Sequence, residues 1–395
     1  MKARPKIALV VSHPIQHFCP QYASFAKHPD IDFKVFFASA LGFKPYHDPN
    51  FKQTIAWNNL QLDQFEHEFL NGEDVLQVDK NLDAPGLDKA LSRFRPDIII
   101  IYGYFQRYQR RAFSWAKRNK VKVAYIADTE MRQTRSGWKE RLKYLYLRYF
   151  FSGVNYALTV GDANEEYYKH VGLKGKQLIR MHFPIDVNLY KKSYEKRLEL
   201  RIQTREHYKI NNGEFVACVV GKLVPWKNQS DIIAAMQLLE EQGTVMHLFI
   251  VGSGEMMNEW QQQAKSLKKS KVHFTGFKTA EELPAFYAAS DVYIHPAAVE
   301  PHSLAVSEAI YMSCPVIISD RCGSYGPTDD VQENRNGFVY PFGDIAILAD
   351  RIKRMIADPQ RRRQFSRYSH SLAQEFQSRA HRQVVHSLIG EYVRS

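Results

Sequence analysis

Short apolar runs rich in β-branched residues alternate with longer, helix-compatible segments along this chain, and this alternation limits the fold more than any other feature. In the first half the runs occupy residues 6–13, 33–39, 97–103, 121–128 and 156–161. A second series occupies residues 214–223, 247–252, 272–277, 292–296 and 315–320. Such alternation predicts doubly wound parallel sheets. Because 395 residues exceed the usual size of one hydrophobic core, we expect an α/β protein of two Rossmann-like domains facing across a cleft.

The break between the two series sets the expected domain boundaries. Residues 186–212 are polar and rich in Lys, Arg and Glu, and we expect a linker with one helix there. Residues 1–185 then form an N-terminal domain, and residues 213–374 form a C-terminal domain. Residues 359–395 carry spaced apolar positions and are expected to be helical throughout, with about 375–395 crossing back to complete the N-terminal domain.

A formal net charge of +12 indicates an attraction to anionic partners. Nucleic acid, acidic lipid and phosphorylated small molecules are all anionic, but the chain carries no RNA- or DNA-binding motif such as an RRM or a zinc finger. We therefore expect no nucleic-acid partner. Sugar nucleotides and anionic membranes become the leading candidates.

The N-terminus offers only a short apolar run, residues 7–11, which predicts a first strand rather than a signal peptide. No apolar segment approaches the roughly 20 residues that a membrane-spanning helix needs. The four cysteines fit no zinc-site spacing, which favours reduced thiols. We expect a cytoplasmic protein, and peripheral attachment to the inner membrane face stays open.

The first motif with chemical meaning is a tight turn after the run that begins at residue 214. Gly221 and Lys222 open the turn, and Lys227 precedes a helix expected to begin near Gln229. A glycine lets the backbone approach a ligand, while two ammonium groups and a helix N-terminus suit a diphosphate. Lysines beside a turn are often merely solvated, so the turn alone leaves both interpretations open.

Two further glycine turns follow strands of the second series. Gly252-Ser253-Gly254 resembles half of a nucleotide-binding loop, although such a pair can also simply turn a strand into a helix. Residues 274–278 place Gly276 and Phe277 at the end of the next strand, where an aromatic ring and exposed backbone groups could receive a base. Packing in the core is an equal alternative for Phe274.

The sharpest signal is the segment from Glu300 to Glu308, which opens a helix that Ser303 is placed to cap. Carboxylates accept hydrogen bonds from vicinal hydroxyl groups, so two of them around a helix N-terminus suit the ribose and the sugar of a nucleotide sugar. Free N–H groups near Ser303 and Leu304 would face its phosphates. The preference of acids for helix starts explains Glu300 but less easily Glu308, which precedes an apolar run.

Seven segments of the second half, in their order and spacing, resemble the retaining glycosyltransferase family 4, the glycogen-synthase-like group with the GT-B fold. They cover about residues 214–360. The segments are 221–223 with Lys227, 251–254, 274–276, 290–292, 300–308, 314–317 and 336–339.

The resemblance implies roles for individual residues. Lys222 and Lys227 would bind the donor diphosphate, Glu308 would hold the ribose, and Glu300 would meet the transferred sugar. Ser303 and Ser313 stand where the family usually has glycine; both are small, so we expect the backbone contacts to survive. The other residues expected at the donor are Gly221, Gly252, Gly254, Phe277, His302, Ser303 and Leu304.

The N-terminal half resembles the family more faintly, mainly through residues 184–186. His13 and His17 follow the first strand, where the family often has a glycine pair, and could touch a phosphate or be structural. Asp128 stands where many members carry a histidine. It would hydrogen-bond the sugar near the anomeric carbon, unless it caps the next helix. The candidate catalytic residues are thus Glu300, Lys227, Lys222, Asp128 and His13.

Residues 138–151 combine four basic residues with nine aromatic or leucine side chains. Such a helix can lie on an anionic membrane near a lipid-linked acceptor. Its apolar residues nearly encircle it, however, which also fits a helix packed in the domain interior.

We therefore expect a glycosyltransferase that moves a hexose or related sugar from a nucleotide diphosphate sugar, UDP or GDP above all, to a glycan or lipid-linked glycan. The resemblance implies retention of configuration and a place in bacterial surface glycan or polysaccharide biosynthesis. Because lysines already face the diphosphate, we expect no metal and no cofactor. The alternatives are an inverting transferase or epimerase on the same fold and a catalytically silent nucleotide-sugar-binding scaffold.

Overall fold

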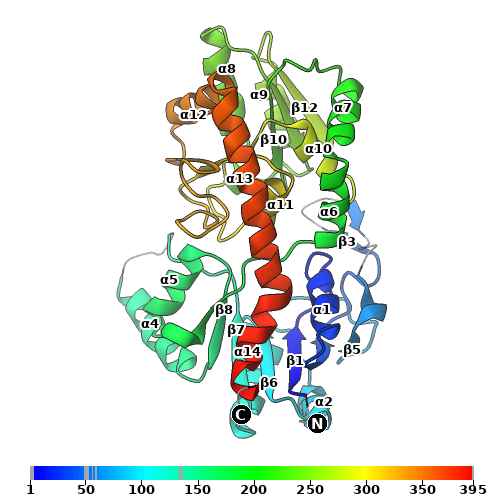
Figure 1. Ribbon diagram of the computed structural model, residues 1–395. Coiled ribbons are helices and arrows are strands. Elements are labelled where there is room, and N and C mark those ends of the chain that lie inside the picture. The colour runs from blue at the N-terminus through cyan, green and yellow to red at the C-terminus, as the bar shows by residue number, and fades with distance from the viewer. Residues whose placement is uncertain (1–3, 49–52, 56, 58–59, 133–136, 394–395) are drawn as a thin grey trace.

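The computed structural model describes residues 4–48, 53–55, 57, 60–132 and 137–393. Two α/β halves lie end to end, and a long C-terminal helix runs along both of them (Figure 1). Strand β1 (Lys6–Val11) begins and helix α14 (Val384–Val393) ends at the far end of the N-terminal half (Figure 1).

The first sheet is parallel throughout, in the order β5-β2-β1-β6-β7-β8-β9. All five apolar runs expected in this half are strands of it. The two edge strands β5 and β9 were not expected, because Glu-His-Glu-Phe of β5 carries no apolar run and Leu-Ile-Arg of β9 has only three residues. The strands are β1 (Lys6–Val11), β2 (Asp32–Phe37), β5 (Glu66–Phe69), β6 (Ile98–Tyr102), β7 (Lys122–Ile126), β8 (Tyr156–Thr159) and β9 (Leu178–Arg180). A short antiparallel pair, β3 (Tyr46–Asp48) and β4 (Gln53–Ile55), lies outside it.

Side chains of this sheet alternate between two hydrophobic cores, as the period of a strand requires. Ile7 and Leu9 face the core shared with α1 and the C-terminal helix, whereas Ala8 and Val10 face the core on the opposite side. The helices of this half are α1 (Cys19–Ala26), α2 (Leu87–Phe94), α3 (Arg107–Arg118), α4 (Trp138–Phe151) and α5 (Asp162–His170).

The second sheet is also parallel, in the order β12-β11-β10-β13-β14-β15. This is the Rossmann order, which reverses between β10 and β13, and ligands of such sheets bind at that reversal, outside the carboxyl ends of the strands. Its strands are β10 (Val216–Val220), β11 (His247–Val251), β12 (Lys271–Gly276), β13 (Val292–His295), β14 (Val316–Ser319) and β15 (Gly337–Tyr340). Its helices are α8 (Ser230–Glu241), α9 (Met257–Ala264), α10 (Leu283–Ala289), α11 (Leu304–Tyr311) and α12 (Ile345–Ala357).

The segment between the sheets holds two helices, so the expectation of one helix was wrong. The Asp186 side chain accepts a hydrogen bond from the Leu189 amide and begins α6 (Val187–Glu195). Lys196 leaves the helical region and α7 (Arg197–His207) follows. Two arginines of α7 hold it to the second half by ion pairs with Asp291, at 2.7 Å from Arg201 and 2.8 Å from Arg205.

The C-terminal segment is helical to Val393, as expected, and crosses back to the N-terminal half (Figure 1). It consists of α13 (Pro359–Ser378), a π-helical turn η4 (Arg379–Gln383) and α14 (Val384–Val393). α13 packs against α11, whereas η4 packs against α1 and α14 against β9. The crossing joins the two halves by one continuous element.

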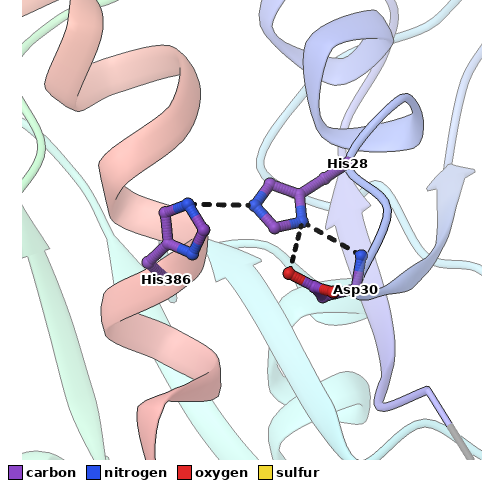
Figure 2. Close-up of side chains that lie close together, drawn as sticks. All are labelled: His28, Asp30 and His386. Atoms are coloured by element: carbon purple, nitrogen blue, oxygen red, sulfur yellow. Dashed lines mark hydrogen bonds and ion pairs between the residues drawn. The ribbon is translucent and has the colours of Figure 1, made fainter. Parts of the chain in front are cut away.

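A histidine pair marks where the crossing helix meets the N-terminal half. Nε2 of His28, in the loop after α1, lies 3.4 Å from Nε2 of His386 on α14 (Figure 2). The Asp30 carboxylate lies on the other side of the His28 ring, 4.0 Å from Nδ1 (Figure 2).

Candidate functional site

A cleft of about 450 Å³ opens at the carboxyl ends of β10 and β11, beside the reversal of strand order. Four of the expected donor residues line it, namely Gly221, Gly252, Phe277 and Glu308. The N-terminal half contributes Gln16, His17 and Trp57, so the cleft lies between the two halves.

The two glycines after β11 are explained by close approach of the backbone. A Cβ atom on Gly252 would lie 2.0 Å from the Gly221 carbonyl oxygen, and one on Gly254 would lie 2.3 Å from the Leu223 carbonyl oxygen. Gly252 also has φ +142°, a region that other residues rarely adopt. The Gly-x-Gly motif therefore lets the turn after β11 cross the turn after β10. Gly254 itself is not part of the cleft wall.

Gly252→Ala is expected to lower the free energy of unfolding by roughly 2–3 kcal/mol, because backbone must move in both turns. It should also weaken nucleotide binding, since the moved turn carries Gly221. Chemical denaturation and nucleotide titration measure the two effects. Gly213→Ala is the matched control, because a Cβ there meets nothing within 4 Å; equal behaviour of the two variants would contradict the close-approach explanation.

Glu308 projects from α11 into the cleft wall and accepts a hydrogen bond of 2.8 Å from the Tyr287 hydroxyl. Burial raises the pKa of Glu308 from 4.5 to about 7, and the Tyr287 hydroxyl opposes this rise. The Tyr190 hydroxyl opposes the rise as well, so two tyrosine hydroxyl groups interact with this carboxyl group in the cleft wall.

Lys227 ends a 3₁₀ turn, η3 (Pro225–Lys227), and forms an ion pair with Glu300 after β13. Burial lowers the pKa of Lys227 to about 8, and the nearby Lys222 ammonium group lowers it further. Nε2 of the buried His295 lies 3.4 Å from the Glu300 carboxylate. Gly221, which lines the cleft, and Lys227 belong to the same loop after β10, so this loop runs from the cleft wall to the ion pair.

His302 is enclosed between two carboxyl groups of the loop after β14. Its Nε2 lies 3.5 Å from Asp329 and 3.7 Å from Asp330, and all three side chains are buried. Burial alone would lower the pKa of His302, but the two carboxylates raise it. The two carboxylates thus favour the protonated form of His302, and His302 does not line the cleft.

Ser303 occupies the N-cap position of α11, but its side chain makes no capping hydrogen bond. The expectation of a side-chain cap was therefore wrong, and the Ser303 N–H instead donates a hydrogen bond of 2.8 Å to the Ser324 hydroxyl oxygen. For the same reason the Ser303 N–H is not available to a phosphate. Leu304 begins the helix and packs against cores of both halves.

Asp128 follows β7 in an extended segment and caps no helix, since the next described helix, α4, has Gly137 at its N-cap without a side-chain bond. The capping alternative is thus wrong. Burial raises the pKa of Asp128, and the charge of His302 opposes this. Asp128 of the N-terminal half thus interacts electrostatically with His302 of the C-terminal half.

His13 and His17 lie close together after β1. Burial lowers the pKa of each to about 4, so both rings are neutral at pH 7. The Ser12 hydroxyl lies 2.8 Å from Nδ1 of His13. Of the two, His17 lines the cleft and His13 does not, so His13 supplies no positive charge for a phosphate.

The expected site residues thus fall into three neighbouring groups: the cleft wall, the Lys227–Glu300 pair, and His302 facing Asp128. Sequence reasoning missed the partners His295, Tyr287, Asp329 and Asp330. The adjacent acids Asp329 and Asp330 were a visible signal, whereas nothing near Tyr287 in the sequence indicates its contact with Glu308.

One Asp-x-Asp triplet, Asp30-Ile31-Asp32, occurs in the chain. It lies at the amino end of β2, where Asp30 is next to His28 (Figure 2). The cleft lies at the opposite, carboxyl ends of strands, so this triplet is not placed to hold a metal ion at a donor diphosphate.

The helix α4 lies on the surface, so the alternative of an interior helix was wrong. Only Leu147 and Phe151 of α4 are buried. Five large apolar side chains are more than half exposed: Trp138, Leu142, Leu145, Tyr146 and Tyr149. None of the described helices combines the length and hydropathy needed to cross a bilayer.

Residues 201–371 match the family described as Glycosyl transferases group 1. This range contains the second sheet and the donor residues named above. Residues 201–371 are therefore similar to group 1 glycosyltransferase domains, and the two Rossmann-like units share the fold of solved glycosyltransferase structures.

The chain is similar to bacterial proteins named as glycosyltransferases. It is 25% identical over 355 residues to the putative glycosyltransferase EpsD of Bacillus subtilis. This match covers 83% of this chain and 88% of that protein. It is 29% identical over 170 residues to the GDP-mannose-dependent alpha-(1-6)-phosphatidylinositol monomannoside mannosyltransferase of Mycolicibacterium smegmatis. The latter match covers 41% of this chain and 44% of that protein, less than half of each.

A solved structure shares the whole fold. Anabaena Alr3699/HepE in complex with UDP-glucose superimposes with a TM-score of 0.68 at 19% identity, over 98% of this chain and 99% of that one. At this identity the similarity concerns the fold.

Proposed function

We propose that this chain, whose residues 201–371 match the glycosyl transferases group 1 family, is a retaining glycosyltransferase of bacterial surface glycan or polysaccharide biosynthesis. Its donor would be a nucleotide diphosphate sugar with UDP or GDP as the nucleotide, and its acceptor a hydroxyl group of a glycan or lipid-linked glycan. We place the reaction at the cytoplasmic side of the membrane.

The observation that carries this proposal is the cleft at the reversal of the second sheet. It gathers a glycine turn, an aromatic side chain and a carboxyl group, with the Lys227–Glu300 pair beside it. A nucleotide sugar presents a base, a ribose diol, a diphosphate and a sugar, and each finds a matching group there. The UDP-glucose complex of a protein with the same fold supports a donor of this class.

In the reaction the bond between the anomeric carbon and the diphosphate oxygen breaks, and the acceptor oxygen attacks the same face of the sugar. The acceptor proton passes to the leaving phosphate oxygen, so no protein nucleophile is required. Negative charge grows on the diphosphate, and the ammonium groups of Lys222 and Lys227 would stabilise it. Closure of the halves would exclude water from the reacting carbon. We expect the reaction to need no metal ion, because these lysines provide the counter-charge.

Thermal-shift measurements with UDP, GDP, ADP, CMP and their common sugars test the donor site, because a ligand that binds only the folded state raises the melting temperature. We expect a clear shift with one nucleoside diphosphate, unchanged by a chelator. NMR of the anomeric proton in the product then tests retention. Inversion would assign the chain to the inverting alternative, and donor binding without transfer or donor hydrolysis would assign it to the scaffold alternative.

The surface of α4 supports a further part of the proposal, peripheral contact with an anionic membrane. Exposed Lys139, Arg141 and Arg148 lie on the same helix as its exposed apolar side chains. Lysine and arginine attract acidic headgroups while aromatic and leucine side chains enter the interface.

Leu145→Glu/Tyr149→Glu is expected to lower vesicle binding about tenfold or more, because two acidic groups replace exposed apolar area and repel anionic lipid. Co-sedimentation with vesicles of phosphatidylglycerol and phosphatidylcholine measures this. Leu198→Glu/Ile202→Glu on α7 is the matched control, since both side chains are also more than half exposed. Equal loss in both variants would show only a general charge effect.

A further inference from the structure

A second pocket, of about 500 Å³, lies between α1, α6 and the C-terminal helix. No residue lines both this pocket and the donor cleft. Helix α6 separates them, because Leu189 and Tyr190 face the cleft whereas Asn188 and Lys191 face the second pocket. The pocket is therefore a distinct site. We call it the hinge pocket, since α6 lies where the chain passes from one half to the other.

The lining of the hinge pocket is cationic and rich in amide groups. Lys27, Lys191 and Arg382 line it, and no Asp or Glu occurs among its described lining residues. Lys27 donates a hydrogen bond of 2.8 Å to Gln64. Lys191 and Arg382 form no ion pair with another residue in the described part of the chain. Cations without a neighbouring carboxylate favour an anion, and amide side chains offer both donors and acceptors to hydroxyl groups.

The π-helical turn η4 builds one wall of this pocket and carries Arg382. Such turns are rare and occur frequently at functional sites. Two side chains of α1 stabilise it: Gln21 donates to the Ala380 carbonyl at 2.6 Å, and Ser24 donates to the His381 carbonyl at 3.0 Å. Helix α1 of the N-terminal half thus holds the irregular backbone of η4 in place. His381 and Arg382 of η4 line the pocket.

His381 supplies no charge to the pocket. Burial lowers its pKa to about 4, and its Nε2 lies 3.1 Å from the Ile185 carbonyl, to which the neutral ring donates. The positive charge of the hinge pocket therefore comes from the two lysines and the arginine.

We propose that the hinge pocket binds a small phosphorylated sugar, with its phosphate on Lys191 and Arg382 and its hydroxyl groups on the amide side chains. The volume lies in the range of small-molecule sites. Residues of α1, α6, the end of α11 and the C-terminal helix all line it. A bound molecule thus contacts both halves and stabilises their present arrangement. This inference does not depend on the proposed transfer reaction.

Calorimetric titration of the full chain with glucose 1-phosphate, inorganic phosphate and glucose tests the proposal. We expect glucose 1-phosphate to bind more tightly than phosphate, and glucose not to bind. Lys191→Ala/Arg382→Ala should weaken glucose 1-phosphate about tenfold or more, because two charge-assisted contacts are lost. Lys89→Ala/Arg363→Ala is the matched control, since it removes the same charges from exposed positions outside the pocket.

Binding at the donor cleft is separated by two further titrations. Glucose 1-phosphate should bind unchanged in the presence of saturating UDP, and unchanged to Lys227→Ala. Loss of binding in either titration would place the ligand in the donor cleft and overturn the proposal. Equal affinities for glucose 1-phosphate and phosphate, or no effect of Lys191→Ala/Arg382→Ala, would overturn it as well. The donor site can fail its own test while the hinge pocket passes, so the two proposals are distinguishable.

Discussion

Lys227→Ala is expected to lower kcat/KM for sugar transfer by about 100- to 1000-fold, the usual effect of removing one group that stabilises developing charge. The affinity for the nucleoside diphosphate should fall by roughly 1.5–3 kcal/mol, the range for a hydrogen bond to a charged group. Lys227 is half-buried beside the cleft, where low polarity strengthens its interaction with a phosphate. Initial rates and calorimetric titration measure the two quantities.

The same substitution leaves the Glu300 carboxylate without its ion-pair partner, which can by itself destabilise the loop after β13. Lys227→Ala/Glu300→Gln separates the two effects, because it removes the unpaired charge without restoring a cation. Its melting temperature should recover while its nucleotide affinity stays low. Lys265→Ala, an exposed position of the same half, is the charge control. Wild-type nucleotide affinity in Lys227→Ala would remove the diphosphate role.

Glu308→Gln is expected to remove a pH-dependent part of the free energy of unfolding that amounts to about 3 kcal/mol. This is the free energy that corresponds to raising the pKa of Glu308 from 4.5 to about 7. The folded state holds the proton of Glu308 more tightly than the unfolded state. Its stabilising contribution is therefore complete below about pH 4.5 and is lost as the pH rises through about 7. The difference in free energy of unfolding between wild type and Glu308→Gln should change accordingly, with wild type losing stability relative to the variant between pH 5 and 8.

Urea unfolding of both proteins across this pH range measures the difference, and subtraction removes the contributions of groups they share. Glu259→Gln, an exposed glutamate on α9, should show almost no such change. A pH-independent difference would contradict the raised pKa of Glu308. In a separate titration Glu308→Gln should bind nucleotide more weakly, because a carboxylate is a stronger acceptor for ribose hydroxyl groups than an amide; unchanged affinity would refute the ribose assignment.

The alternation of apolar runs was enough to predict both sheets, because the period of a strand and the turn chemistry of its ends are local properties. All ten predicted runs contain a strand, and the glycine turns at Gly221 and Gly252 lie at the strand ends where they were expected. The order of the motif segments also placed Lys227 and Glu300 in the same half. The edge strands β5, β9 and β15 lie outside these ten runs, because each has only three or four residues.

The sequence by itself therefore determined the α/β architecture, the strands and the chemical types gathered after β10, β11 and β13. Only the tertiary structure decided which of these residues meet: Glu308 with Tyr287, Lys227 with Glu300, and His302 with the acids 329 and 330. It also decided that α4 is exposed and that a π-turn faces α6. The physical reason is that strand and helix formation follow from neighbours in sequence, whereas burial, pKa and pairing depend on the order in which distant strands assemble.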